Sequence, residues 1–448
     1  MPPEHQVGSS NLSGRASSSR TPSHRGMDQP GVLLLIIAYW FPPSGEIGAL
    51  RPFRFFKYLR QLGYDCRIIT ATAQSVPSSN ITVVRDALEG VWDSPPGQRL
   101  PRKAYLEYLF RRFMLPGHIG FVWSWAVAAE CRRIVRNNPG KQVVVFSTYP
   151  PIGTLLAGLL TRMRNRARWI ADFRDPIGGV PMELLPPRVR FWTRVFERLT
   201  FHFADAVIAN VEAAATVWRQ SYPEAQPRLH VVYNGYDPDD MPQARSIPAR
   251  DRRLIVHAGT LYHGRNPNVV LEAFARLHQR GITEASSARM MFVGEVDSRA
   301  GLNKAIADAG QKEGWLEFKG IVPRDEALRL LQEADGLLLV QPQTNIQVPG
   351  KLFEYICIGR PILAIAPRSS PIEEILLKSG VAQVCIYPDD AAEVVDSKLL
   401  AFLRFANRPS LVSEWFQANF NSRLQTDILA RIVDGLRSAR QPRSNAQP

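Results

Sequence analysis

Short, almost wholly apolar runs alternate with longer segments of helical periodicity along most of the chain. Runs with no polar alternation are typical of strands in parallel sheets that helices cover on both faces. The predicted strands are 32–38, 65–70, 143–146, 169–172, 206–209 and 230–232, then 254–257, 290–293, 316–318, 336–340, 362–364 and 382–386. The clearest helical patterns in the first half are 49–61, 123–136, 152–162 and 188–202. The pattern therefore predicts an α/β protein.

A polar, proline-containing stretch, 237–252, separates the two series of strands. We therefore expect two Rossmann-like, doubly wound domains, 31–240 and 241–405, that face each other across a cleft. Ligands of such sheets bind beyond the carboxyl ends of the strands. The stretch 406–448 contains helical patterns with no strand after them, so we expect a C-terminal helix that crosses back to the first domain. Residues 1–30, rich in Ser and Pro, are expected to form a disordered leader.

Composition restricts the class of protein further. The chain has 448 residues and a formal net charge of +14 at pH 7. Its four cysteines are far apart and form no CxxC pattern, which indicates neither a disulfide framework nor a zinc site and favours a reducing, cytoplasmic compartment. The longest apolar run, Val32–Phe41, is too short to cross a bilayer, which takes about 20 residues.

Basic and aromatic residues are interleaved in three segments of the first half, namely 51–60, 102–113 and 188–198. Helices of this composition can lie on anionic lipid or on nucleic acid. The solvated faces of ordinary core-packed helices have the same pattern, so that alternative stays open. Because no nucleic-acid-reading module is recognisable, we expect no nucleic-acid partner and keep an anionic membrane surface as the candidate.

The first predicted strand ends in the sequence YWFPPSGEIG, residues 39–48. Gly45 and Gly48 let the backbone approach a ligand closely, and the next helix offers free N–H groups and the positive end of its dipole. An anion or a sugar hydroxyl would fit there. The loop is neither a GxGxxG nor a GxxxxGK[ST] motif, so NAD and ATP chemistry lack their usual evidence.

Charged residues follow the predicted strand 169–172 directly. Asp172, Arg174 and Asp175 come one after another where a buried strand ends, and such groups are costly unless they pair or bind a ligand. Two interpretations stay open. The residues form a structural Asp-Arg clamp, or the carboxylates orient a hydroxyl or act as a base at the cleft.

Two loops of the second half are typical of phosphate binding. Arg265 precedes a helix start at Asn266-Pro267, where free N–H groups and a cation suit a phosphate. Gly350 and Lys351 open another helix and can bind phosphate in the same way, while Glu354, one turn along, can hold ribose hydroxyls. The alternative for the second loop is a plain exposed Lys/Glu pair.

Nine segments in order carry a resemblance to a known family. They are YWFPPSGEIGALRPFRFFKYL, FSTYPP, WIADFRDP, ADAVIANVEA, VVYNGYD, HAGTLYHGRNP, FVGE, FKGIVP and VPGKLFEYICIGRPILAI. Together they resemble the retaining glycosyltransferases of GT-B fold, family 4 (glycosyl transferase group 1), in particular those of polysaccharide biosynthesis. The resemblance covers about residues 31–405 and implies a nucleoside-diphosphate sugar as donor substrate, with no further cofactor.

The resemblance implies roles for matching residues in the second domain. Arg265, Lys351 and the amide of Gly350 would hold the donor diphosphate. Glu354 matches the glutamate that binds the nucleotide ribose, and the backbone at Ile321 and Val322 would contact the base.

On the acceptor side the resemblance implies that the loop at Gly45 approaches the donor phosphates and the acceptor. Asp172, Arg174 and Asp175 fall where the first domain presents acceptor-side groups. We assign catalytic roles to Arg265, Lys351, Asp172 and Asp175.

The chain departs from the family pattern at three positions. Ile346 stands eight residues before Glu354, where the family often has a glutamate for the donor sugar. This recognition must then fall to the backbone or to one of the polar neighbours Gln343, Thr344, Asn345 and Gln347. Thr260 replaces an arginine after the strand-end glycine. Arg174 takes the place of a first-domain histidine.

The implied reaction transfers a sugar to an acceptor hydroxyl with retention, the acceptor being a lipid-linked or polysaccharide precursor. The front-face mechanism of such enzymes needs no protein nucleophile, so the lack of a carboxylate pair for double displacement is no objection. Asp237-Pro238-Asp239 resembles a metal-binding DxD motif but follows a turn at the linker, so we expect no metal. A peripheral position on the inner face of the membrane would suit a lipid-linked acceptor.

Two other functions stay open. A nucleotide-sugar 2-epimerase of the same fold would need no acceptor. A catalytically degenerate protein that binds a nucleotide sugar without turnover would explain Ile346 and Thr260.

Overall fold

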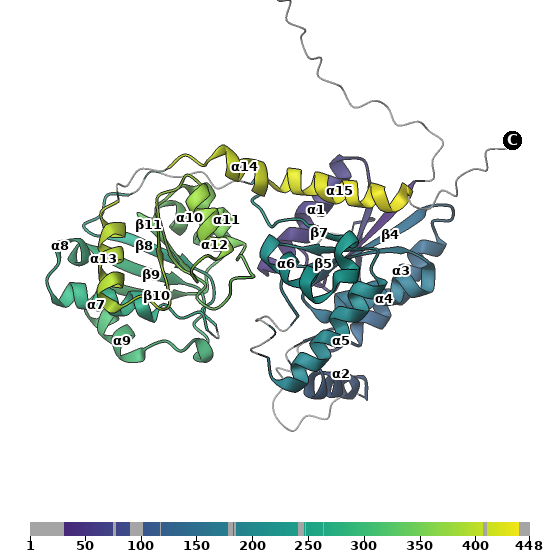
Figure 1. Cartoon of the computed structure of the whole chain (residues 1–448), viewed down its shortest axis with the longest axis horizontal. Helices are drawn as coiled ribbons and strands as arrows, with labels where there is room; N and C mark the ends of the chain where they lie inside the picture. Colours follow the sequence, from purple (N-terminus) through teal and green to yellow (C-terminus); the bar gives the residue numbers. More distant parts are fainter. Residues whose placement is uncertain are drawn as a thin grey trace, which may run out of the picture.

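Two parallel sheets, each covered by helices, make up the chain (Figure 1). The computed structural model describes residues 31–74, 78–89, 102–116, 118–177, 182, 185–240, 246, 248–262, 264–405 and 410–438. The leader predicted at 1–30 lies outside the described residues, as do 406–409 and 439–448 of the C-terminal stretch.

The first sheet has seven parallel strands in the order β3-β2-β1-β4-β5-β6-β7. Its strands are β1 (Val32–Ile37), β2 (Asp65–Thr70), β3 (Ile81–Val83), β4 (Gln142–Tyr149), β5 (Arg168–Phe173), β6 (Ala206–Ala209) and β7 (Leu229–Val231). All residues of β1 are buried, as expected for a central strand with helices on both faces. The sequence pattern missed β3, because this edge strand has only three residues, none of them fully buried.

The second sheet has six parallel strands in the order β10-β9-β8-β11-β12-β13. Its strands are β8 (Arg253–Ala258), β9 (Ala288–Val293), β10 (Leu316–Gly320), β11 (Gly336–Val340), β12 (Ile362–Ile365) and β13 (Gln383–Ile386). Strand order reverses between β8 and β11 here and between β1 and β4 in the first sheet. Ligands of open parallel sheets bind outside these reversal points, at the carboxyl ends of the strands.

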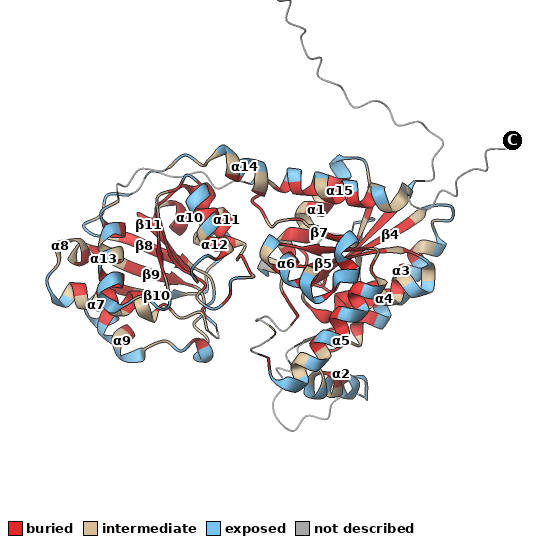
Figure 2. Ribbon diagram, in the orientation of Figure 1, coloured by how far each residue is buried: buried red, intermediate tan, exposed pale blue. Residues whose placement is uncertain are grey.

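Helices cover both faces of each sheet (Figure 2). In the first half they are α1 (Leu50–Gln61), α2 (Arg102–Phe113), α3 (Trp123–Arg136), α4 (Ile152–Asn165), α5 (Pro187–Phe203) and α6 (Glu212–Ser221), with 3-10 turns η1 (Ile47–Ala49) and η4 (Pro223–Arg228). In the second half they are α7 (Asn268–Gln279), α8 (Thr283–Ser286), α9 (Lys304–Lys312), α10 (Arg324–Gln332), α11 (Lys351–Ile358), α12 (Pro371–Lys378) and α13 (Ala392–Leu403), with η5 (Ser298–Ala300). Within the described residues, no helix combines the length and apolar character needed to cross a bilayer.

The chain returns to the first domain through α14 (Glu414–Phe420) and α15 (Ser422–Ser438) (Figure 1). Buried Leu429 and Val433 of α15 join the core cluster that contains Phe55 of α1. The predicted crossing of a C-terminal helix is therefore confirmed. The doubly wound α/β architecture predicted from the sequence is confirmed as well.

Aromatic residues join the crossing segment to both domains. Phe416 and Phe420 of α14 contact the ring of Phe353 in α11, and Phe416 stacks on Tyr236 of the linker at 5.6 Å. The amide of Tyr236 donates to the carbonyl oxygen of Phe420 over 3.0 Å. This packing holds the linker against the start of α15, and with it the facing loops of the two sheets.

Candidate active site

The loops after β8 and β11 meet at the reversal point of the second sheet. Lys351, the first residue of α11, donates from Nζ to the carbonyl oxygen of Ala258, the last residue of β8, over 2.8 Å. Gly259 has φ +124° and lies against this ammonium, so a Cβ there would collide with Nζ. The hydroxyl of Tyr355, one turn along α11, accepts from the amide of Ala258 at 2.9 Å.

Within the described ranges, Lys351 has no carboxylate partner for its ammonium form. Its side chain is buried, and among the described residues no carboxylate lies within ion-pair distance of it. Burial and, to a lesser extent, the field of Arg265 lower the pKa of Lys351 to about 7, against the opposing effect of Glu354. An ammonium held in this way gains more from a bound anion than an exposed lysine does.

Arg265 links the two domains electrostatically. Its guanidinium lies 4.3 Å from the ring centre of Tyr262, and burial lowers its pKa while Tyr262 and Asp175 raise it. Asp175 belongs to the loop after β5 of the first domain. Burial raises the pKa of Asp175, whereas Arg174 and Arg265 lower it. The structure thus brings Arg265, Lys351 and Asp175 to one place between the sheets.

Gly350 and Glu354 lie on either side of Lys351 in chain order. Gly350 is the N-cap of α11, where the free N–H groups of the helix begin. Glu354 is partly buried and forms an ion pair with Arg324, at 2.7 Å between Nη2 and Oε1. The plain exposed Lys/Glu pair considered from the sequence does not form, because Glu354 pairs with Arg324 and Lys351 with a carbonyl.

The remaining donor-side residues lie on loops of the same sheet edge. Ile321, directly after β10, is 78% exposed, and Val322 packs partly against the core. Asn345 is exposed. The side chain of Gln343 lies so close to Gly264, which has φ +77°, that any Cβ there would collide with its amide. Gln343 therefore joins Asn345 as a polar group beside the Arg265 loop.

In the first domain, Asp172 is held in an ion pair that the sequence did not indicate. Arg51 of α1 donates from Nε and Nη2 to the two carboxylate oxygens over 3.0 and 2.7 Å, and Thr148 donates to one of them over 2.7 Å. Arg51 also donates to the carbonyl oxygens at positions 232 and 233. Because the Asp172 side chain has no exposed surface, this geometry fits the clamp interpretation, with Arg51 rather than Arg174 as the partner.

The side chain of Arg174 is bound to the backbone of two segments, the turn at Gly48 and the end of β4. It donates to the carbonyl oxygens of Gly48, Tyr149 and Pro150 over 2.6, 3.1 and 2.5 Å. A Cβ on Gly48 would collide with its guanidinium, so Gly48 serves this contact, whereas no atom lies within 4 Å of a Cβ built on Gly45. Arg174 therefore connects the Gly45 loop to the loop of Asp175.

The Asp237-Pro238-Asp239 sequence does not form a ligand set. Lys57 donates from Nζ toward Asp237 and Asp239 at 3.1 and 2.9 Å, and the hydroxyl of Tyr58 donates to Asp237. Within the part of the chain that the structure describes, no group of three or more His, Cys, Asp or Glu side chains could hold a metal ion. Both aspartates thus join the linker to α1.

Sequence reasoning missed two residues that shape the site, namely Arg51 and Tyr355. Arg51 and Tyr355 stand at helical positions within segments already singled out, YWFPPSGEIGALRPFRFFKYL and VPGKLFEYICIGRPILAI. In the sequence, Arg51 and Tyr355 could have been noticed only as polar residues at helical positions beside apolar ones. Their partners lie far away along the chain, so only the folded structure identifies them.

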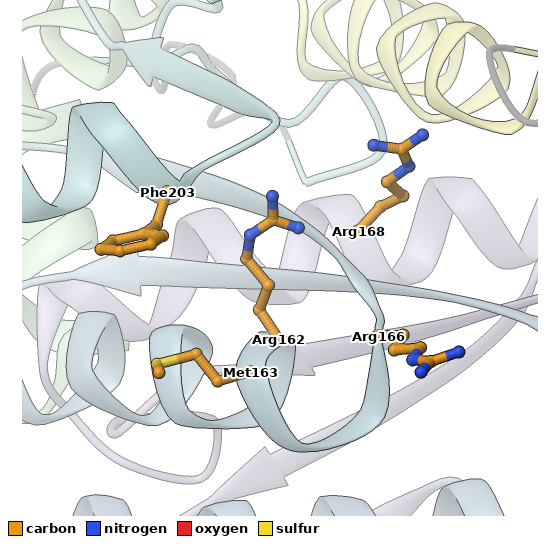
Figure 3. Close-up of a pocket in the computed structure, with 5 residues that line it drawn as sticks. All are labelled: Arg162, Met163, Arg166, Arg168 and Phe203. Atoms are coloured by element: carbon orange, nitrogen blue, oxygen red, sulfur yellow. The ribbon is translucent and has the colours of Figure 1, made fainter.

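A separate cavity of about 410 Å³ lies at the opposite end of β5 (Figure 3). It is lined by Arg162, Met163, Arg166, Arg168 and Phe203. Arg162 and Arg168 both form ion pairs with Asp205, at 2.8 and 2.6 Å. Arg168 begins β5 and Asp172 nearly ends it, so this cavity does not belong to the site between the domains.

Comparison with family models identifies the chain. A model described as Glycosyltransferase Family 4 matches residues 53–240, and a model described as Glycosyl transferases group 1 matches residues 252–403. The chain belongs to glycosyltransferase family 4, within the group 1 transferases. The matched segments include both halves of the site, with Asp175 in the first and Arg265 and Lys351 in the second.

Solved structures similar to this transferase share its GT-B fold. HepE of Anabaena in complex with UDP and glucose is 13% identical and has a TM-score of 0.59, with 90% of this chain and 99% of that one covered. Sucrose-phosphate synthase of Thermosynechococcus elongatus is 14% identical, with a TM-score of 0.60 and coverage of 91% and 100%. A glycosyltransferase of Rickettsia africae is 13% identical, with a TM-score of 0.57 and coverage of 92% and 99%. The GT-B fold predicted from the sequence is confirmed.

None of the curated proteins matches the sequence.

The clamp interpretation of Asp172 predicts a loss of stability when Arg51 is removed. Arg51→Ala leaves a buried carboxylate without its charge partner, so we expect the free energy of unfolding in urea to fall by about 3–5 kcal/mol. Arg60→Ala, at an exposed position of the same helix, should cost less than about 1 kcal/mol. Equal stability of the two variants would contradict the clamp.

The pKa of Lys351 predicts the pH dependence of diphosphate binding. With a pKa of about 7, the free transferase has a mostly neutral Lys351 above that pH and must take up a proton to bind the anion. The affinity for UDP, whose terminal phosphate ionises near roughly pH 6, should therefore fall by up to about tenfold per pH unit above pH 7. Calorimetric titration measures this, and Lys351→Met should remove the dependence. An affinity for UDP that does not change with pH in the unmodified transferase would contradict the role of Lys351.

Proposed function

We propose that the protein transfers a sugar from a nucleoside-diphosphate sugar to an acceptor hydroxyl with retention at the anomeric carbon. The observation that carries the proposal is the convergence of Lys351, Arg265 and the free N–H groups of α11 at the reversal point of the second sheet, facing Asp175 of the first. A leaving diphosphate needs such a preorganised positive site, because charge on its bridging oxygen develops in the transition state.

The acting groups divide between binding and reaction. Lys351 and Arg265 stabilise the departing diphosphate, and the departing phosphate accepts the proton of the acceptor hydroxyl, so no protein nucleophile is required. Asp175 orients that hydroxyl from the first domain. Positioning of the two substrates against each other supplies much of the remaining rate. Asp172 acts indirectly, because it holds α1 and the loop of Asp175 in place.

Groups around Lys351 support recognition of the donor. Glu354 lies one turn along α11 and binds the ribose together with its partner Arg324. The exposed backbone at Ile321, with Val322, contacts the base. Gln343 and Asn345 serve the sugar in place of the glutamate replaced by Ile346. The loop at Gly45 closes the site from the first domain, and no metal is needed because the diphosphate is held by cations of the protein.

Direct transfer can be tested with a panel of nucleotide sugars, including UDP-sugars, and a membrane lipid extract. We expect a mass increase of one sugar in a lipid or saccharide acceptor, and we expect Lys351→Met/Arg265→Met to weaken UDP binding by about 100-fold or more, because charge-assisted phosphate contacts are lost. Lys304→Met/Arg299→Met, at exposed positions of the same domain, serves as the control.

The alternatives give different results in the same assay. A nucleotide-sugar product formed without acceptor would indicate an epimerase. Tight donor binding with no product from any acceptor would indicate a degenerate binding protein. An unchanged affinity for UDP in the double variant would contradict the diphosphate site itself.

We further propose that the acceptor is a lipid-linked precursor of a polysaccharide and that the protein works at the inner face of the cell membrane. Large apolar side chains are exposed on α2 beside cations: Tyr105, Leu106 and Phe113 are 57, 55 and 53% exposed. Arg102, Lys103 and Arg112 on the same helix are exposed as well. A helix with this composition binds at an anionic membrane interface.

Vesicle binding tests the membrane proposal. Arg102→Ser/Lys103→Ser/Arg112→Ser should lower partition onto phosphatidylcholine vesicles that contain phosphatidylglycerol by about 100-fold, since each cation near the surface contributes about 1 kcal/mol. Arg299→Ser/Lys304→Ser/Lys312→Ser makes the same charge change in the second domain as a control. Equal binding of both triple variants would contradict the assignment of this surface.

A further inference from the structure

A cavity of about 310 Å³ lies between α5 and α6 on the first domain and adjoins the candidate active site. Its volume is within the range of small-ligand sites, about 300–1,000 Å³. Pro176 and Ile177, the two residues after Asp175, form part of its wall. From the second domain, Ile346 closes it. Ile346 is the residue that replaces the donor-sugar glutamate of the family, so one end of the cavity lies beside the expected position of the transferred sugar.

The walls of the cavity are apolar and its charge is positive. Ile177, Val217, Trp218 and Ile346 contribute apolar surface. Arg194 and Arg198, one turn apart on α5, line the cavity and are exposed. Among the described residues neither arginine has an ion-pair partner, so two cations are available at the opening.

The buried carboxyl group in the wall leaves this charge largely uncompensated. Glu197 is 2% exposed and accepts a hydrogen bond from the hydroxyl of Tyr222 over 2.8 Å. Burial raises the pKa of Glu197 to about 7 despite the opposing effects of Tyr222, Trp218 and Arg194. Glu197 is therefore partly protonated near neutral pH, which favours an anionic ligand at Arg194 and Arg198.

An exposed apolar side chain lies beside the two arginines of the cavity. Phe191 lies one turn before Arg194 on the same face of α5 and is 59% exposed. The ring of Phe196 in α5 packs on Phe110 of α2 at 5.7 Å, which places the two helices side by side (Figure 1). Exposed Leu106 of α2 lies one turn from Phe110. Phe196 lies on the opposite face of α5 from Arg194 and Arg198, so α2 packs away from the cavity, and Phe191 is the exposed apolar side chain on the side of the two arginines.

From these observations we infer that the cavity is the subsite for a phosphate-linked lipid carrier of the acceptor. Arg194 and Arg198 bind the phosphate groups, and the first isoprenoid or alkyl units contact the apolar wall and leave over Phe191. The acceptor hydroxyl is then presented at the end closed by Ile346, next to Asp175. The inference rests on the proposed function and names the acceptor class for it. A free phosphate would use the two arginines but gain nothing from the apolar surface.

Calorimetric titration with farnesyl diphosphate, inorganic pyrophosphate and farnesol tests the subsite. We expect saturable binding of farnesyl diphosphate that is at least about 30-fold tighter than binding of pyrophosphate or farnesol. Arg194→Ala/Arg198→Ala should weaken it by about 100-fold. Arg132→Ala/Arg136→Ala removes two exposed arginines with the same spacing from α3 and should leave it unchanged. Val217→Trp, which fills the cavity without removing a charge, should also abolish binding.

The outcomes separate the subsite from the donor site. Pyrophosphate that binds as tightly as farnesyl diphosphate would overturn the lipid assignment, and equal effects of the two double-arginine variants would overturn the location. UDP is titrated into each variant in parallel and should bind unchanged. UDP binding without any binding of farnesyl diphosphate would overturn the subsite alone, whereas failure of the unmodified protein to bind UDP would contradict the proposed function.

Discussion

Uncompensated positive charge, buried at the reversal point of the second sheet, is the constraint on which the rest of this structure depends. Lys351 has a carbonyl oxygen as its partner, and Arg265 adds a second positive charge nearby. Such an arrangement is costly in the unliganded protein, and a bound diphosphate offsets the cost. The glycines around it follow from the same constraint, because Gly259 and Gly264 leave room for Lys351 and Gln343. In the proposed function the bound anion is the diphosphate of the donor.

In the first domain, two arginines hold the loops that lie opposite this site. Arg51 holds Asp172 and the backbone after β7, and Arg174 holds the loops at Gly48 and Pro150. These contacts fix the loop on which Asp175 lies, so that its carboxyl group is within the field of Arg265. The aromatic packing of Phe416 and Phe420 against the linker keeps the two sides together. Structural arginines in one domain therefore position an acid for chemistry in the other.

Ile346, which stands where the family often has a glutamate, also lines the cavity of the first domain that we propose for the acceptor. The position loses a carboxylate that would address the donor sugar, and in the folded protein the new side chain closes a cavity of the first domain. In the proposed function this one residue affects both substrates, because the donor loop and the acceptor cavity share it. The proposed lipid subsite explains why an apolar residue is suitable there, since a charged group would meet the same apolar wall.

Local chemistry determined the elements and much of the site from the sequence alone. Continuous apolar runs predicted all strands except β3, because burial on both faces leaves a signal in each strand by itself. The loops of Asp175, Arg265 and Lys351 could be chosen because parallel strands place their carboxyl ends at one edge. Only the tertiary structure decided the partners. Arg51 meets Asp172 across 121 positions of the chain, and Glu354 pairs with Arg324 instead of Lys351, since contacts between distant residues depend on how whole elements pack. The cavity closed by Ile346 was decided in the same way, because its walls come from both domains and neither sequence segment alone encloses a volume.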